Sequence, residues 1–145
     1  MTIEAYARQR TSALLRQLAF IMGRATRSSD PTLINDLCTA LERFELCLFM
    51  FLRFYPRAEA KKIQRRVKKM LRLSRRVHDH DVALAFLRHP RRRLSGQISG
   101  HGRQEVGLYN HLSQQRKLTV EALREYIRKF SQREWSKRWR VRLGA

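Results

Sequence analysis

Four adjacent residues near the middle of the chain, His78-Asp79-His80-Asp81, are of types that bind metal ions and transfer protons. Imidazole and carboxylate groups ligate divalent cations, so a metal held by Asp79 and Asp81 would point to a phosphate-processing enzyme. Neighbouring residues of a helix point about 100° apart, however, so four in a row do not converge on one ion. The remaining histidines, which would have to supply further ligands, are His89, His101 and His111. We therefore predict no metal site.

Asp79 and Asp81 also have a structural interpretation. They are placed to cap a short helix over residues 82–87 and to pair with Arg75 or Arg76. Other catalytic patterns are missing from the sequence, which has no GxxxxGKS/T phosphate loop, no HExxH and no Cys/His arrangement suited to nucleophilic attack. We predict that the protein is not an enzyme and holds no cofactor.

Anion binding is the second chemistry that the sequence offers, in the stretch from Pro56 to Leu87. At helical periodicity its apolar residues fall on one side, and its basic residues cover the other. The apolar residues are Ile63, Val67, Met70, Leu71 and Val77. The basic residues are Lys61, Lys62, Arg65, Arg66, Lys68, Lys69, Arg72, Arg75 and Arg76.

Glu59 is the only acid in this stretch before Asp79. A solvated helix face usually mixes charges, because opposite charges four residues apart stabilise it and like charges repel. A polyanion lying along this face explains the missing acids, and a basic solubilising surface is the alternative. The whole chain has the same bias, with 32 basic and 12 acidic residues and a formal net charge of +20, which favours acidic polymers or surfaces as partners.

The length of 145 residues predicts one domain, residues 1–145, that buries roughly two-thirds of its unfolded surface. The most apolar run, residues 46–52, is closed by Glu45 and Arg53, so it is expected to be a buried helix turn and not a membrane span. Cys38 and Cys47 have no metal-ligand spacing and are expected to be buried as small apolar residues. No secretory signal is evident, and we predict a cytoplasmic protein.

The periodicity predicts an all-α fold, an antiparallel bundle of about four to five helices with one strongly basic face. Asp30 and Pro31 suit the start of the second helix, and Ser131 with Glu134 forms a capping-box pattern before the last one. A Gly-rich basic loop is expected at about 89–107. The expected helices cover 2–26, 31–55, 56–77, 82–87, 109–130 and a short segment after 131.

Aromatic residues near the C-terminus could stack nucleic-acid bases, although at this helical spacing they more often belong to a core. They are Tyr126, Phe130, Trp135 and Trp139. The neighbouring arginines 138, 140 and 142 either extend an anion-binding track or are simply solvated.

The order of these features resembles the CHAD family, the conserved histidine α-helical domain. Three segments carry the resemblance, and together they span most of the chain. They read L-I-N-D-L-C-T-A-L-E-R-F from Leu33, R-R-V-H-D-H-D-V-A-L from Arg75, and L-Y-N-H-L-S-Q-Q-R-K-L-T-V-E-A-L-R-E-Y-I from Leu108. The resemblance implies antiparallel helices that bind inorganic polyphosphate through surfaces lined by lysine and arginine.

The chain departs from the family pattern in its second helix. Asn35 stands where the family has its histidine, and Cys38 and Glu42 replace arginines, which leaves Arg43; in the third helix His78 replaces an arginine. The family domain also has two similar helical halves around a basic groove, and this chain is long enough for one. The resemblance thus implies either a homodimer, paired through the apolar second helix to complete a two-half groove, or an open basic face.

The resulting hypothesis is a non-catalytic module that binds inorganic polyphosphate, in the cytoplasm and with polyphosphate granules where these occur. Its central contacts are Arg65, Arg66, Lys69, Arg72 and Arg76, flanked by Lys61, Lys62, Lys68 and Arg75, with Arg43 and Arg116 as extensions from neighbouring helices. Arginine suits this ligand because its planar fork grips phosphate oxygens in a bidentate manner. The alternative is an RNA- or DNA-binding protein that uses the same face, with the two tryptophans or the arginines 91–93 reaching bases or grooves.

Overall fold

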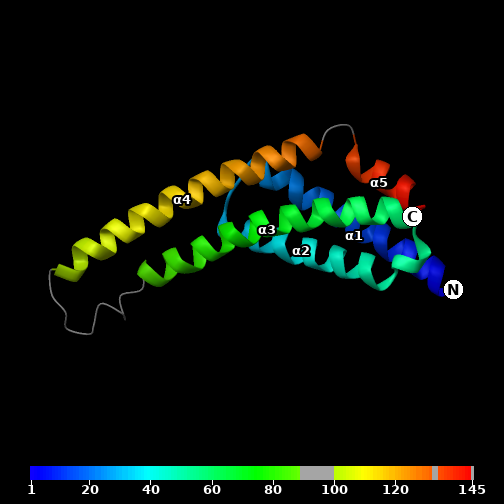
Figure 1. Ribbon diagram of the computed structural model, residues 1–145, viewed down its shortest axis with the longest axis horizontal. Helices are drawn as coiled ribbons and strands as arrows, with labels where there is room; N and C mark the ends of the chain where they lie inside the picture. The colour runs from blue at the N-terminus through cyan, green and yellow to red at the C-terminus, as the bar shows by residue number, and fades with distance from the viewer. Residues whose placement is uncertain (89–99, 132–133, 145) are drawn as a thin grey trace.

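The computed structural model describes residues 1–88, 100–131 and 134–144, and over these ranges all regular structure is helical, with no strand. The all-α prediction is therefore confirmed. The elements, shown in Figure 1, are α1 (Ile3–Ala25), α2 (Pro31–Met50), the 3-10 turn η1 (Leu52–Phe54), α3 (Arg57–Arg88), α4 (Gly100–Phe130) and α5 (Trp135–Leu143).

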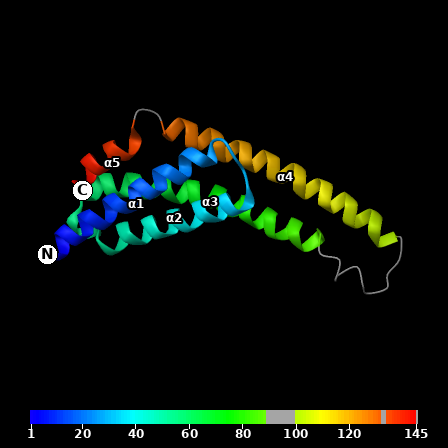
Figure 2. The ribbon, with the colours of Figure 1, turned by 180° about the vertical axis from the view of Figure 1, so that it is seen from behind.

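The helices form a bundle around α3. From α1 to α4 consecutive helices run in opposite directions, α2 packs against both α1 and α3, and α4 runs back along α3. The short helix α5 contacts α1 and α3 at the end of the bundle that also holds the N-terminus (Figure 2). At the other end, α3 and α4 continue past α1 and α2 in both views.

The beginning of α2 follows from its sequence. Asp30 accepts a hydrogen bond from the Thr32 backbone N–H at 2.8 Å, and Pro31 occupies the first helical position, where a missing N–H costs nothing. Both features confirm the sequence prediction, and the first helix was also predicted to within a residue at each end.

An aromatic cluster fixes α5 to the rest of the bundle. Phe130 lies 4.7 Å from Trp139 and 5.2 Å from Trp135, measured between ring centroids, and Trp139 stacks on Phe44 of α2 at 5.9 Å. Trp135 and Trp139 are 6% and 2% exposed. Phe130, Trp135 and Trp139 therefore belong to the core, as their helical spacing favoured, while Tyr126 is only partly buried against it. The predicted burial of both cysteines is confirmed.

The predicted interruption of the third helix is wrong, because α3 runs unbroken from Arg57 to Arg88. No proline or glycine lies within it, and Pro90 is the first residue that would stop it. Asp79 and Asp81 therefore lie inside the helix and cap nothing. Their predicted partners are wrong too, since Arg75 pairs with Glu42 and Asp81 pairs with Arg116.

The second helix ends at Met50, earlier than predicted. The chain then crosses to α1, where the Tyr55 hydroxyl donates to the Ala7 carbonyl at 3.1 Å and shares a hydrogen bond with Thr11. The apolar run 46–52 was predicted to be buried, but Leu46, Phe49 and Met50 are 58–70% exposed. They lie on the side of α2 that no other described helix covers.

Two further boundaries differ from the predictions. The helix α4 begins at Gly100, so the predicted loop 89–107 is helical from residue 100, where good helix formers such as Arg103 and Glu105 outweigh three glycines at up to about 1 kcal/mol each. Residues 89–99 lie outside the described part of the chain. The predicted capping box is also absent, because α5 starts at Trp135 after Glu134, whose side chain caps nothing.

No helix in the described ranges is both long and apolar enough to cross a membrane.

Candidate functional site: the basic face of α3

The basic face consists of nine exposed cations on α3. It spans about 22 Å along the helix axis, at a rise of about 1.5 Å per residue. The opposite side of α3 is buried at 0–2% exposure, which confirms the predicted separation of the two sides. The face consists of Lys61, Lys62, Arg65, Arg66, Lys68, Lys69, Arg72, Arg75 and Arg76.

Acids from α2 border one margin of this face. Glu42 accepts hydrogen bonds from the Arg75 guanidinium, the shorter at 3.0 Å, and Glu45 lies 4.0 Å from the Lys68 ammonium. Burial raises the pKa of the Cys38 thiol beside them to about 11, and the negative charges of Glu42 and Asp79 add to the shift. This margin is therefore partly neutralised by the protein itself.

Aromatic rings of α4 support the other margin. The Arg66 guanidinium lies 5.5 Å from the Phe130 ring centroid, and the Lys69 ammonium lies 4.9 Å from the Tyr126 ring centroid. Burial raises the pKa of the Tyr126 phenol, against the opposing effect of Arg66. A ring face attracts a cation without neutralising its charge, so both side chains are held in place and remain able to bind an anion.

Six of the nine cations make no ion pair within the described part of the chain. They are Lys61, Arg65, Arg66, Lys69, Arg72 and Arg76. The other three each face a glutamate, at 3.7 Å from Lys62 to Glu59 and at the two α2 contacts already described. The unpaired six, here called the strip, run along the length of the face from Lys61 to Arg76.

Two shallow cavities lie on the basic face, each large enough for a few phosphate groups. One of about 430 Å³ is lined by Glu45, Lys68, Leu71, Arg72, Arg75, Arg76 and Asp79. The other, of about 470 Å³, is lined by Arg57, Ala58, Lys61, Lys62 and Arg65. Arg57 was not among the predicted site residues. It lies four residues before Lys61, and this helical spacing is the signal that could have identified it.

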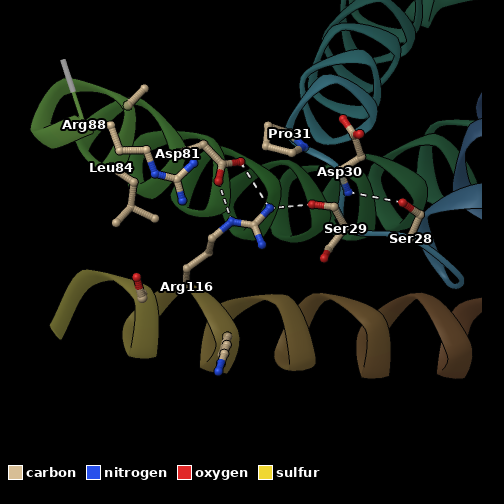
Figure 3. Close-up of a pocket in the computed structure, with 11 residues that line it drawn as sticks. Ser28, Ser29, Asp30, Pro31, Asp81, Leu84, Arg88 and Arg116 are labelled. Atoms are coloured by element: carbon tan, nitrogen blue, oxygen red, sulfur yellow. Dashed lines mark hydrogen bonds and ion pairs between the residues drawn. The ribbon is translucent and has the colours of Figure 1, made fainter. Parts of the chain in front are cut away.

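Arg43 and Arg116, the two predicted extensions of the binding site, do not join the basic face. Arg43 is exposed on α2, but the α2 residues that reach the face are the acids Glu42 and Glu45. Arg116 of α4 binds the Asp81 carboxylate and donates to the Ser29 carbonyl, so it ties α4 to α3 and to the α1–α2 connection (Figure 3). The Arg116 and Asp81 side chains are only 18% and 10% exposed, so this arginine acts as a link between helices.

A separate cleft of about 590 Å³ surrounds this link (Figure 3). Its charges are mixed, because Asp30 and Asp81 lie among the cations, and Arg88 already donates to the Tyr109 hydroxyl at 2.9 Å. The lining residues are Ser28, Ser29, Asp30, Pro31, Asp81, Leu84, Ala85, Arg88, Ser113, Arg116 and Lys117. For a polyanion, the basic face is the better surface, because six of its cations have no acidic partner in the described structure.

The His78–Asp81 segment forms no metal centre within the described residues, where no group of three or more histidine, cysteine or acidic side chains is placed to hold a metal ion. Asp81 is turned to Arg116, while Asp79 lines the cavity beside α2. Of the arginines on α5, Arg142 lies 3.9 Å from Glu59 at the start of α3. This places α5 next to the N-terminal end of the basic face.

Comparison of the chain with protein-family models, curated proteins and solved structures finds no match in any of the three. The resemblance to the CHAD family therefore rests on the sequence motifs alone.

Proposed function

We propose that this protein binds inorganic polyphosphate along the basic face of α3, without catalysis. The observation that carries the proposal is the strip of six exposed cations that have no acidic partner in the described structure. Like charges so close together destabilise the free protein, and a polyanion relieves this repulsion and releases its own condensed counterions on binding. The central contacts are Arg65, Arg66, Lys69, Arg72 and Arg76.

The burial of the aromatic residues favours a polymer without bases over a nucleic acid. Trp135 and Trp139 are 6% and 2% exposed, so they offer no platform on which bases could stack. Phosphate oxygens need only cations and N–H donors, which the basic face supplies. On this proposal the protein acts in the cytoplasm, with polyphosphate granules where these occur.

A competition experiment tests the proposal. The affinity of the protein for long-chain polyphosphate is compared with its affinity for single-stranded and duplex nucleic acids of matched charge, over a series of salt concentrations. We expect a preference for polyphosphate that persists near physiological salt. Equal affinities that collapse together as salt rises would show an unselective cation, and a preference for nucleic acid would establish the alternative function.

A further inference from the structure

The two cavities on α3 lie toward opposite ends of the basic face and differ in the charges that line them. The cavity near the start of the helix, here called the N-terminal cavity, has a volume of about 470 Å³, and none of the described residues that line it is acidic. The cavity further along, here called the C-terminal cavity, has a volume of about 430 Å³ and includes Glu45 and Asp79. Four described cations line each cavity, so the difference between the two lies in their acids.

The N-terminal cavity keeps nearly all of its positive charge. Three of its four cations make no ion pair within the described part of the chain. They are Arg57, Lys61 and Arg65. The fourth, Lys62, lies 3.7 Å from one oxygen of Glu59, and the other oxygen of that carboxylate lies 3.9 Å from Arg142 of α5. Among the described residues, five cations therefore share one acid, which leaves a local net charge of +4.

The C-terminal cavity is largely neutralised by the protein. Glu45 lies 4.0 Å from Lys68. Glu42 accepts hydrogen bonds from Arg75, and Asp79 lies in the cavity lining. Among the described residues, four cations face three acids here, a local net charge of +1. The positive charge of the basic face therefore falls from the N-terminal to the C-terminal end of α3.

A linear polyphosphate also has an uneven distribution of charge. Each inner phosphate is bonded to two bridging oxygens and keeps one ionisable oxygen, so it carries a single negative charge. A terminal phosphate has one bridging oxygen and two ionisable ones, and with a second pKa near 6 it carries a charge of about −1.5 to −2 at pH 7. The chain end is therefore the most highly charged phosphate of the polymer, and it has the most free oxygens for arginine and lysine donors.

We propose, as an inference that rests on the proposed polyphosphate-binding function, that the N-terminal cavity binds the terminal phosphate of a linear chain. The inner phosphates then follow the strip toward Arg76, because Lys61 and Arg65 belong both to this cavity and to the strip. Arg57 supplies a further guanidinium for the chain end. The opposite direction would place the most highly charged phosphate where the protein itself supplies acids, so the polymer binds from one end and in one direction.

A comparison of linear with cyclic triphosphate tests the site, because the ring has no terminal phosphate. We expect the wild-type protein to bind the linear form roughly tenfold more tightly, as measured by titration calorimetry. The double variant Arg57→Gln, Lys61→Gln should reduce this preference to about twofold, since both cations of the N-terminal cavity lose their charge.

The matched control is Arg72→Gln, Arg76→Gln. It removes the same charge from two exposed, unpaired cations of the C-terminal cavity that are also four residues apart on α3. Linear triphosphate carries more total charge than the ring, and the control accounts for this difference because it should keep the preference for the linear form. No preference in the wild-type protein, or an equal loss of preference in both variants, would overturn the proposal.

Long chains with blocked ends separate this inference from the proposed function. Converting both terminal phosphates to phosphoramidates removes their second ionisable oxygen and leaves the inner phosphates intact. Blocking should weaken binding to the wild-type protein and to the control variant roughly tenfold, and should have little effect on the Arg57→Gln, Lys61→Gln variant. If blocked and free chains bind the wild-type protein equally well, the end site is refuted while binding along the strip stands. If neither chain binds, the proposed function fails as well.

Discussion

Salt dependence offers a quantitative test of the basic face. Each phosphate contact of a flexible polyanion contributes about −0.7 to the slope of log K against log salt concentration. The six cations without acidic partners therefore predict a slope of about −4. Affinity for polyphosphate should then fall about 250-fold between 50 and 200 mM salt, by the same relation.

Neutralising three of these cations should halve that slope. In the triple variant Arg65→Gln, Lys69→Gln, Arg72→Gln, three contacts remain, so the expected slope is about −2. The fall in affinity over the same salt range becomes about 20-fold. Glutamine keeps much of the length of each side chain and favours the helix, so circular dichroism should show unchanged helicity.

The measurement is a titration of labelled polyphosphate, followed by fluorescence anisotropy at four or more salt concentrations. The control triple variant Arg10→Gln, Arg16→Gln, Arg27→Gln removes the same charge from exposed positions on and just after α1. Its slope should equal that of the wild type. If both triple variants lose slope equally, net charge drives binding, and the assignment of the site to α3 is refuted.

Three further predictions concern stability. Arg116→Met leaves the Asp81 carboxylate buried without its partner and should lower the free energy of urea unfolding by about 2 kcal/mol, whereas Lys117→Met at an exposed neighbour should change it by under about 0.5 kcal/mol. Trp139→Ala removes the centre of the aromatic cluster and should cost about 4 kcal/mol in the same assay; a loss below about 1 kcal/mol would contradict that role. Burial raises the pKa of Cys38 from 9.0 to about 11, so the unfolded chain loses this proton first and folding stability falls as pH rises from 9 to 11. Cys38→Ala should show a fall smaller by about 2 kcal/mol in unfolding curves across that range, and identical curves would contradict the shifted pKa.

The parts of the fold that sequence predicted correctly are those set by local pattern. Alternation of apolar and basic residues at helical period placed Ile63 and Val67 in the core and the nine cations of α3 outside. Asp30 and Pro31 marked a helix start for the same reason, since a cap depends only on residues within one turn.

The parts that sequence missed depend on contacts between distant residues. Asp81 suggested a helix cap because its true partner, Arg116, lies 35 positions away. Arg116 was predicted to contact the ligand because the sequence around it shows no acidic partner. Its partners, Asp81 and Ser29, come close only when the helices pack together. The exposed run at Leu46 was likewise predicted to be buried, since an apolar segment does not reveal which of its sides the neighbouring helices will cover.

The placement of the acids explains how a chain of net charge +20 keeps one helix face unneutralised. Four ion pairs of the described structure join different helices, and each has its acid where two helices meet: Glu42 and Glu45 between α2 and α3, Asp81 between α3 and α4, and Glu59 between α3 and α5. At these seams an opposite charge both relieves repulsion and holds two helices together. The six unpaired cations of α3 meet no acid of another helix, and where they touch α4 they meet aromatic rings. An acid placed among them would stabilise only its own helix, by a few tenths of a kcal/mol. Because the acids hold the helices together at their seams, the strip stays free to bind a polyanion.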